Sequence, residues 1–509
     1  MKKIKNIVML SLLAVVLATT SCSDFLNINT DPNRVTGDNV TPNLIFTQAE
    51  NAVGRRAAIR FVFLNNWMGY WSRSGTFIVE QEETTYKATN TFSENNWDDT
   101  YNILFDLNQV KTRALAANDS VLAGAAMVLS VKLWQEAVDQ FGDIPYTQTF
   151  DYLKYPTPTY DKATDIYADL LVQTDKAIQY LNSVQPKLLK ATFVASDIIF
   201  ARGGDVTAAK TSWKKLANTI KLRIFLHQAA TGTAPTTAQL AKITTDGGFL
   251  AAGENVTVQP GYSNTVKSST ETRQNPFYGA YGNTPGNVAA TTNNKPNNYF
   301  VKTILKATDP RISKFYLGTV VGTDYGALGG NAANSNNTIV GSEIYPGTPT
   351  QDQFILPAYE SLFFQAEAIT RNWLSGGDAA AKTMFESAIN ESFVFLGLTS
   401  ADATTYIGAV TSAQWANSGT SVASKVQFIG FQKYIANCGK DPLESWTDYR
   451  RGALVLPAGY LSYNPNRTNN TLPNVLPYPQ TEWSVNSANI ASKGRNTTTI
   501  FTEKMFWQP

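Results

Sequence analysis

Apolar residues recur at three- and four-residue spacing through the front half of the chain, which predicts amphipathic helices. Between 205 and 230 the stripe consists of Trp213, Leu216, Ile220 and Ile224, the spacing of one helical face. Asp205 stands where an N-cap residue would begin that helix. The same pattern predicts further helices in the stretches 41–59, 94–117, 120–140 and 161–183.

A second helical block follows at 356–374 and 378–396, where Ser375-Gly376-Gly377 separates two helices. Repeated antiparallel pairs of this kind indicate solenoid-like packing without a strict sequence period. The stretches 251–300, 318–354 and 456–482 are instead rich in Gly, Asn, Thr and Pro, and we expect long irregular loops with a few short strands. The predicted fold is therefore mostly α, a helix-pair scaffold in one large domain.

The first 21 residues have the layout of a secretory signal. Lys2, Lys3 and Lys5 precede an apolar run of about a dozen residues, and small residues follow before Cys22. That run is too short for a membrane span, which requires about 20 residues. Cysteine occurs only twice in the chain, so a chance cysteine at this position is a poor explanation. We expect residues 1–21 to be a lipoprotein signal peptide and Cys22 to carry the lipid anchor.

Charge and composition narrow the function of the mature chain, 22–509. Residues 1–21 hold three of the 42 basic residues, which leaves 39 against 40 acidic ones. A balance near neutrality argues against nucleic-acid binding, which requires a basic excess. Charged residues make up 16% of the chain, against an average of about 25%. The surface must then be covered by uncharged polar side chains, which suits an outer-membrane or extracellular setting.

Catalytic motifs are scarce. The single histidine, His227, continues the stripe of the 205–230 helix, so we interpret it as a packing residue. One histidine and one mature cysteine exclude zinc sites built from either type, and no metal or cofactor is expected. No G-x-S-x-G elbow and no P-loop occurs. A pair of carboxylates remains possible, because glycosidases need only two; the candidates cluster at Glu80, Glu82, Glu83, Asp98 and Asp99.

Seven short segments with recognisable spelling are spread over the mature chain. In chain order they are Cys22-Ser23-Asp24-Phe25-Leu26-Asn27, Phe141-Gly142-Asp143-Ile144-Pro145-Tyr146, Trp213-Lys214-Lys215-Leu216-Ala217-Asn218, Asp309-Pro310-Arg311, Gln365-Ala366-Glu367-Ala368, Glu444-Ser445-Trp446-Thr447-Asp448-Tyr449-Arg450-Arg451 and Tyr478-Pro479-Gln480-Thr481-Glu482. Together they resemble motifs of the SusD/RagB family of nutrient-binding lipoproteins of Bacteroidetes. Each motif is short, but their common order makes the resemblance specific. The family often has Arg at the position of His227, so no family role passes to that residue.

The resemblance implies a scaffold of TPR-like helix pairs, in agreement with the periodicity. It also implies a palmitoylated lipoprotein of the cell outer membrane, facing the extracellular side. Its partner would be a SusC-like TonB-dependent transporter, over which the lipoprotein closes like a lid and to which it delivers oligosaccharide or peptide. No catalysis is expected on this basis. The alternative from a different class is an extracellular glycoside hydrolase that uses a carboxylate pair.

Two regions are candidates for the ligand site, because sugar C–H groups pack on aromatic faces while amides and arginines bind hydroxyls. The first has dense aromatics before and after a loop signal: Trp67, Tyr70, Trp71, Phe77 and Tyr86. The second lies in an Asn-rich loop and comprises Tyr262, Arg273, Asn275, Phe277, Tyr278, Tyr281 and Tyr299. Exposed aromatics on polar loops are the expected form of such a surface. Trp71 and Tyr278 are the best single candidates; Trp97 and Tyr101, at helical spacing, are interpreted as packing.

Overall fold

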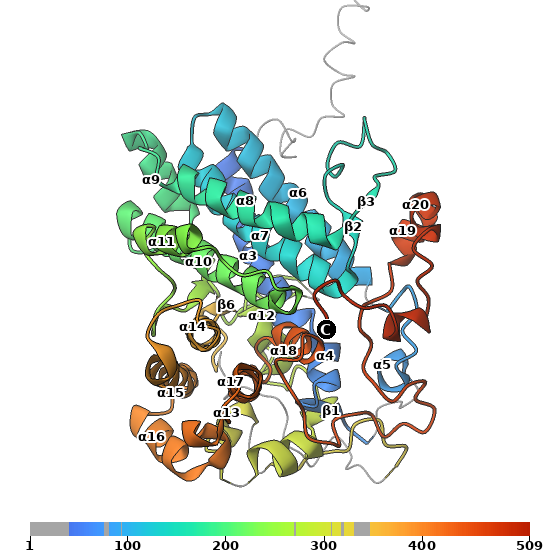
Figure 1. The fold of residues 1–509 in the computed structure, drawn as a ribbon. Helices are drawn as coiled ribbons and strands as arrows, with labels where there is room; N and C mark the ends of the chain where they lie inside the picture. Colours follow the sequence, from blue (N-terminus) through green and yellow to red (C-terminus); the bar gives the residue numbers. More distant parts are fainter. Residues whose placement is uncertain are drawn as a thin grey trace, which may run out of the picture.

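The computed structural model describes residues 40–75, 81–92, 94–268, 271–306, 308–316, 320–329 and 347–509. Two groups of long helices form the scaffold (Figure 1). The first group comprises α3 (Pro42–Ile59), α6 (Glu94–Ala116), α7 (Ser120–Phe141), α8 (Ala163–Leu181), α9 (Lys187–Ser196), α10 (Val206–His227) and α11 (Thr237–Thr245). The second group comprises α14 (Ala358–Thr370), α15 (Gly377–Phe395), α16 (Ser400–Ala409) and α17 (Val422–Ala436).

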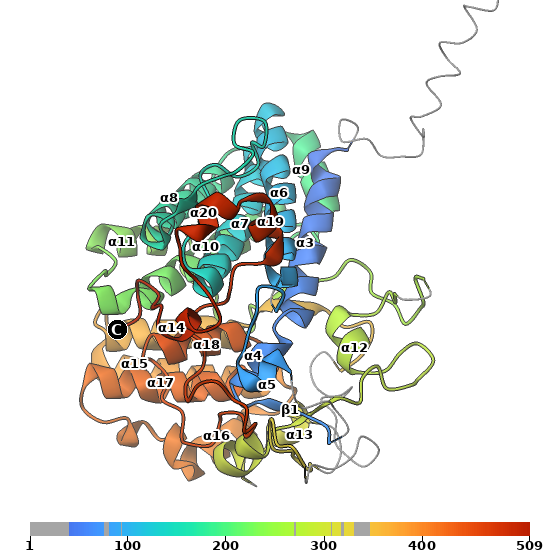
Figure 2. The same ribbon diagram turned by 90° about the vertical axis from the view of Figure 1, so that its right-hand side faces the viewer.

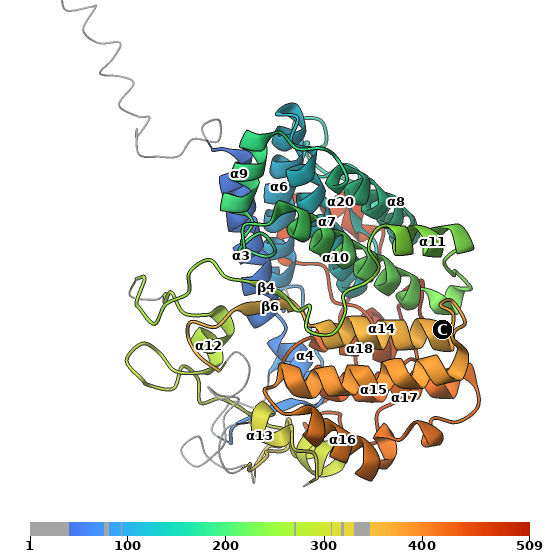
Figure 3. The same ribbon diagram turned by 90° about the vertical axis from the view of Figure 1, so that its left-hand side faces the viewer.

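Consecutive long helices pack on one another, as the periodicity predicted. In the first group α6 packs on α7, α7 on α8, and α3 against α6; in the second, α14 packs on α15 and α17. Helix α10 contacts both α8 and α14 and so joins the two groups, which lie one above the other in Figure 3. Helix α7 is long and apolar enough to cross a membrane, but 94% of its apolar window is buried inside the protein. The prediction of a mostly helical, helix-pair fold is confirmed.

Shorter elements connect and cover these groups. The short helices are α4 (Val62–Trp67), α5 (Glu82–Thr85), α12 (Pro276–Tyr281), α13 (Ile312–Phe315), α18 (Pro442–Arg450), α19 (Gln480–Val485) and α20 (Ser487–Ala491). Single 3₁₀ turns occur at η3 (Ala229–Thr231), η6 (Thr411–Ala413), η7 (Trp415–Asn417) and η8 (Thr499–Phe501), and η4 (Phe300–Leu305) is a π-helix. The C-terminal segments with α19 and α20 cross the face shown in Figure 2.

The described strands form three antiparallel pairs. Two pairs join strands that are far apart in sequence, and the third closes a local loop. They are β1 (Trp71–Arg73) with β5 (Asn294–Pro296), β2 (Ile144–Pro145) with β3 (Tyr160–Asp161), and β4 (Val256–Val258) with β6 (Gln353–Leu356). Trp71 faces Pro296 across the first pair and Arg73 faces Asn294. The loop stretch 251–300 therefore contains β4, α12 and β5, which the composition did not reveal individually.

A buried ionic cluster ties α18 to the scaffold. Lys433 of α17 contacts Glu444 at 2.7 Å and Asp448 at 2.8 Å, and the Arg451 guanidinium contacts the Glu367 carboxylate of α14 at 2.6 Å. His227 lies between the carboxylates of Glu444 (3.0 Å) and Asp139 (3.1 Å). Ion pairs this deeply buried must be matched closely, since an unpaired buried charge is costly. The prediction that His227 is a packed, buried residue is confirmed.

Candidate functional site

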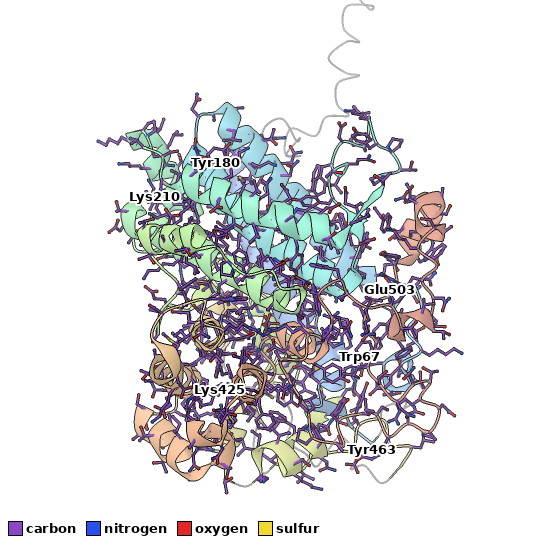
Figure 4. The ribbon with its side chains drawn as sticks, in the orientation of Figure 1. Trp67, Tyr180, Lys210, Lys425, Tyr463 and Glu503 are labelled. Atoms are coloured by element: carbon purple, nitrogen blue, oxygen red, sulfur yellow. The ribbon has the colours of Figure 1, made fainter. Side chains whose placement is uncertain are left out.

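The first candidate region lies in the core and not on the surface. The side chains of Trp67, Tyr70, Trp71 and Tyr86 are at most 1% exposed. Trp67 lies inside the molecule in Figure 4, and its Nε1 donates to the Glu83 carbonyl at 3.0 Å. The Tyr70 hydroxyl donates to the Tyr434 carbonyl at 2.6 Å. The expectation that these rings are exposed is therefore wrong, because side chains of α12, α17 and α18 pack against Trp71, Tyr70 and Trp67.

Two predicted residues of this region need separate mention. Phe77 lies outside the described residues, as does the anchor residue Cys22. Tyr86 has a left-handed backbone with φ of 58°, which is uncommon for an aromatic residue. Its hydroxyl accepts a hydrogen bond from the Ser462 amide at 2.8 Å, so Tyr86 fastens the C-terminal segment to the scaffold.

Four of the seven predicted residues of the second region are also buried in the fold. Phe277, Tyr281 and Tyr299 are at most 6% exposed, and the Trp71 ring lies 5.2 Å from that of Tyr281. Asn275 is buried and caps α12, accepting a hydrogen bond from the Tyr278 amide at 3.0 Å. Capping of this kind satisfies a helix-terminal N–H group, which explains Asn at this position without a ligand. The two predicted regions are neighbours nevertheless, joined through β1, β5 and these rings.

The remaining residues of the second region reach solvent. Tyr262 and Tyr278 are half-buried and Arg273 is exposed. Tyr262 and Arg273 line an open cleft of about 590 Å³ between α3 and the segment that leads into α12. We call it the α3–α12 cleft; its lining residues are Asn51, Arg55, Ile59, Pro260, Gly261, Tyr262, Lys267, Glu271, Thr272, Arg273, Gln274, Pro276, Gly279 and Ala280. Figure 3 shows the loops around α12 standing out from the helices.

Hydrogen bonds orient Tyr262 in this cleft. Its hydroxyl donates to Asn51 Oδ1 of α3 at 3.3 Å, and its amide donates to Gln259 Oε1 at 2.7 Å. Burial and the nearby Asp352 carboxylate raise the pKa of the Tyr262 hydroxyl above its ordinary value, so the hydroxyl stays protonated. One edge of the ring is thus fixed to the scaffold, while the residue remains partly open to solvent.

The charges of the cleft are mainly basic. Lys267 and Glu271 form an ion pair at 2.8 Å, and the hydrogen bond from Lys267 lowers the pKa of the Glu271 carboxyl. Among the described residues, none hydrogen-bonds or ion-pairs with the guanidinium of Arg55 or Arg273. Guanidinium groups are planar donors suited to hydroxyl, carboxylate and sulfate oxygens. The cleft therefore offers an aromatic ring, side-chain amides and two arginines whose guanidinium groups are not bonded to other described residues.

Sequence reasoning missed the wall that α3 contributes. Arg55 and Arg56 are adjacent, yet Arg56 is buried and bonded to Glu136 at 2.5 Å while Arg55 is exposed. Successive helical residues are rotated by about 100°, which places them on different faces. The two adjacent arginines can be seen in the sequence. Which of them is buried depends on how α3 is rotated about its axis against α6 and α7.

The predicted carboxylate clusters do not form a catalytic pair in this cleft. Glu82 accepts a hydrogen bond from Thr89 at 2.7 Å, and Glu83 pairs with Arg73 at 2.9 Å. Asp99 pairs with Arg60, the residue that follows α3. Glu80 lies outside the described residues. In the described part of the chain no group of three or more His, Cys, Asp or Glu side chains could hold a metal ion.

Comparisons with known proteins place the chain in a family. A family model described as starch-binding associating with outer membrane, of SusD-like type, matches residues 32–479. A SusD/RagB family protein from Bacteroides thetaiotaomicron has a similar structure, with a TM-score of 0.70, 18% identity and coverage of 92% of this chain and 99% of that chain. A SusD homolog from Bacteroides fragilis has a TM-score of 0.65 and 19% identity, with the same coverage of both chains.

A third structure, a chitin-binding SusD homolog from Flavobacterium johnsoniae, has a TM-score of 0.67 and 18% identity, and the match covers 91% of this chain and 98% of that one. No curated protein sequence matches the chain significantly. The structural likenesses span nearly the full length of both partners, and the family model covers most of the chain. The chain belongs to the SusD-like family.

Proposed function

We propose that this protein captures saccharides at the bacterial outer membrane and delivers them to a SusC-like TonB-dependent transporter. The observation that carries the proposal is the α3–α12 cleft in a chain of the SusD-like family, whose description is starch-binding. Two of the similar structures are chitin-binding proteins, which favours a saccharide over a peptide. The Tyr262 ring and the free guanidinium groups of Arg55 and Arg273 supply an apolar face and hydroxyl-binding donors.

The proposed role is binding without catalysis. Among the described residues that line the α3–α12 cleft, Glu271 is the one carboxylate, and it forms an ion pair with Lys267. Most glycoside hydrolases use two carboxyl groups across the scissile bond. Incubation with starch and glycol chitin, followed by measurement of reducing ends, tests this point; release of sugar by the purified protein would favour the hydrolase alternative.

Affinity gel electrophoresis tests saccharide capture directly. Soluble starch, glycol chitin, xylan and pectin are the probes, and retardation of the wild type by at least one of them is expected. The variants Tyr262→Ala and Arg273→Ala should weaken that binding roughly tenfold each, because one ring or charged contact contributes about 1–3 kcal/mol. Tyr463→Ala removes an exposed ring outside this cleft and serves as the matched control. Migration of the wild type unchanged in every gel would contradict the proposal.

Attachment to the membrane through Cys22 is a second part of the proposal. The first described residue is Val40, and α3 begins two positions later at Pro42. This start of α3 lies at the upper end of the first helix group, beside α9 (Figure 2). Several acyl chains on one cysteine give stable anchoring. Metabolic labelling with a fatty-acid probe should label the wild type and not Cys22→Ala, and the variant should be released from the membrane. Equal label on both proteins would contradict the anchor.

The partner is the third part. A lid over a channel needs a large interface that can still open, so the complex should survive only mild detergent. We expect the protein to co-purify with a SusC-like barrel when it is extracted gently from its own cells. Recovery as a lone monomer under all detergent and salt conditions would count against delivery to a transporter, while leaving saccharide capture intact.

A further inference from the structure

The loop between β2 and β3 exposes aromatic and aliphatic side chains that the fold does not use. This loop, 146–159, stands out beside the upper helices in Figure 1. Tyr152 is 74% exposed and Leu153 is 84% exposed, and Phe105 of the adjacent α6 is 43% exposed. Clustered exposed apolar side chains mark interaction sites more often than single ones do.

Of these three side chains, Tyr152 lines a cleft of about 510 Å³ between α6, the 145–158 segment and the start of α19. We call it the β2–β3 cleft; its lining residues are Trp97, Asp98, Tyr101, Asn102, Pro145, Gln148, Thr149, Phe150, Tyr152, Tyr155, Pro156, Pro158, Thr481 and Glu482. Trp97 and Tyr101 form its rigid floor, with ring centroids 4.7 Å apart and the Tyr101 hydroxyl bonded to the Pro145 carbonyl at 2.7 Å. Their interpretation as packing residues is confirmed by this geometry.

The aromatic wall includes a strained residue. Phe150 has a φ of 68°, in the left-handed region that bulky residues rarely adopt. Its ring is held between those of Phe105 (5.8 Å) and Trp134 (6.2 Å). Strain of this kind persists only where the surroundings enforce it, and it concentrates at functional sites. Phe150 therefore presets the course of the loop that carries Tyr152 and Tyr155.

The polar groups of the cleft are acids and amides. The Glu482 carboxylate is oriented by the Tyr160 hydroxyl at 2.8 Å and by Asn486 Nδ2 at 3.1 Å. Gln148 Oε1 accepts from the Thr159 amide at 3.0 Å, which leaves its amide nitrogen free of bonds to any described residue. Asn102 is exposed and makes no side-chain hydrogen bond within the described part of the chain.

Asp98 is the second acid of the cleft. Burial, together with the carboxylates of Glu94, Asp99 and Glu482, raises the pKa of Asp98 above its ordinary value. Among the described residues that line the β2–β3 cleft none is basic, in contrast to the arginines of the α3–α12 cleft, and the nearby Lys154 ammonium lies over the Tyr155 ring, 4.9 Å from its centroid. An anionic ligand would be repelled here, whereas carboxylates and amides accept and donate to neutral hydroxyls.

We infer that the β2–β3 cleft is a second saccharide-binding site, specific for a run of uncharged sugar units. The sugar faces lie against the rings of Tyr152 and Tyr155, and their hydroxyl groups bond to Asp98, Asn102 and Gln148. This inference rests on the proposed function, because the ligand class is the same. The two clefts lie apart, with α12 and α19 on different sides of the molecule in Figures 1 and 2.

Two separated sites on one protein bind two stretches of one polymer, and the second contact is then intramolecular. A long polysaccharide is held more tightly than a short oligosaccharide that fills one cleft. Loss of the β2–β3 cleft should therefore weaken binding of long chains most. Such a site would retain a polymer at the surface while its free end enters the α3–α12 cleft.

The test uses affinity gel electrophoresis with soluble starch, glycol chitin and xylan as neutral probes. The double variant Tyr152→Ala/Asp98→Asn changes one exposed ring and one carboxyl oxygen, so the fold should persist, which circular dichroism checks. We expect a dissociation constant about tenfold higher than that of the wild type. Tyr463→Ala, whose ring is 58% exposed at the lower right of Figure 4, should behave as wild type.

Each outcome decides one question. Wild-type retardation by the double variant, with loss of retardation in Tyr262→Ala, would overturn the second site and leave the proposed function standing. A wild type that no polysaccharide retards would overturn both. Unchanged saccharide binding with loss of the co-purifying barrel would show that the cleft contacts a protein, and this also overturns the inference. A larger defect on long than on short oligosaccharides would support it.

Discussion

Two aromatic-rich regions of this protein look alike in sequence and behave differently in structure. Trp67, Tyr70 and Trp71 fall within five residues, and Phe150, Tyr152 and Tyr155 fall within six. The first set is fully buried, whereas the second borders an open cleft and contains a ring that is 74% exposed. The density of rings along the chain therefore does not report whether they face a ligand.

The difference comes from what covers each set. The Trp67 ring lies 6.2 Å from that of Trp446 in α18, and Tyr70 stacks on Tyr434 of α17 at 4.6 Å. Both partners come from residues more than 350 positions away along the chain. In the described part of the chain, late segments contact the far end of the β2–β3 loop through Asn486 and Asn489 but leave Tyr152 74% exposed. Burial of a loop aromatic is thus decided by segments far away in sequence.

The largest effect is expected from Trp446→Ala, which removes the ring that supports the buried set. Trp446 is fully buried, its Nε1 donates to the Pro473 carbonyl at 3.1 Å, and the Arg450 guanidinium lies 3.4 Å above its ring. Deletion of a buried tryptophan side chain costs about 3–5 kcal/mol. Urea unfolding followed by circular dichroism measures this loss. An unchanged unfolding curve combined with lost saccharide binding would make Trp446 a ligand residue and reverse the comparison.

A smaller effect, dependent on pH, is expected from Glu367→Gln. Burial alone would raise the pKa of Glu367, but the bidentate Arg451 guanidinium lowers it to about 2. Because the folded pKa lies below the unfolded value, this carboxylate stabilises the fold above pH 4.5 and loses that contribution as the pH falls toward 2.

The variant should therefore be less stable at pH 7, by about 2–3 kcal/mol, because it loses a charged hydrogen-bond acceptor and leaves Arg451 with the Asp448 carboxylate and the Leu226 carbonyl. The difference from wild type should shrink below pH 4. Glu386→Gln on α15, whose carboxylate is 3.8 Å from Lys382, is the surface control and should change stability little at any pH. A constant difference between Glu367→Gln and wild type from pH 7 to pH 3 would show that the charge of Glu367 is not what matters.

The smallest effect on stability is expected from Tyr152→Ala. Substitutions of exposed side chains usually change the free energy of unfolding by less than about 0.5 kcal/mol, and Tyr463→Ala should do the same. Thermal unfolding of both variants checks this. A loss comparable to that of Trp446→Ala would mean that the β2–β3 loop is part of the core, and the comparison between the two regions would fail.

The long helices could be predicted closely from the sequence. The stretches 94–117, 120–140 and 205–230 correspond to α6, α7 and α10, because each carries an apolar stripe that must be buried whatever its partner. The turn at Phe141-Gly142-Asp143 could be recognised from the spelling of the SusD-like motif. Gly142 adopts a φ of 69° there, a conformation that favours glycine. The short elements α12, α18 and β5 lack a periodic signal and are defined by their contacts.

The sequence by itself determined the helical scaffold and the family, because periodicity and motif spelling are local properties. Only the tertiary structure decided which rings and charges face solvent. Trp71, one of the two preferred ligand residues by sequence, is buried beside Tyr281 and faces Pro296 across a strand pair. Arg55, which no pattern singled out, opens into the α3–α12 cleft. The physical reason is that exposure depends on which distant segment packs over a side chain, and that packing is a property of the whole chain.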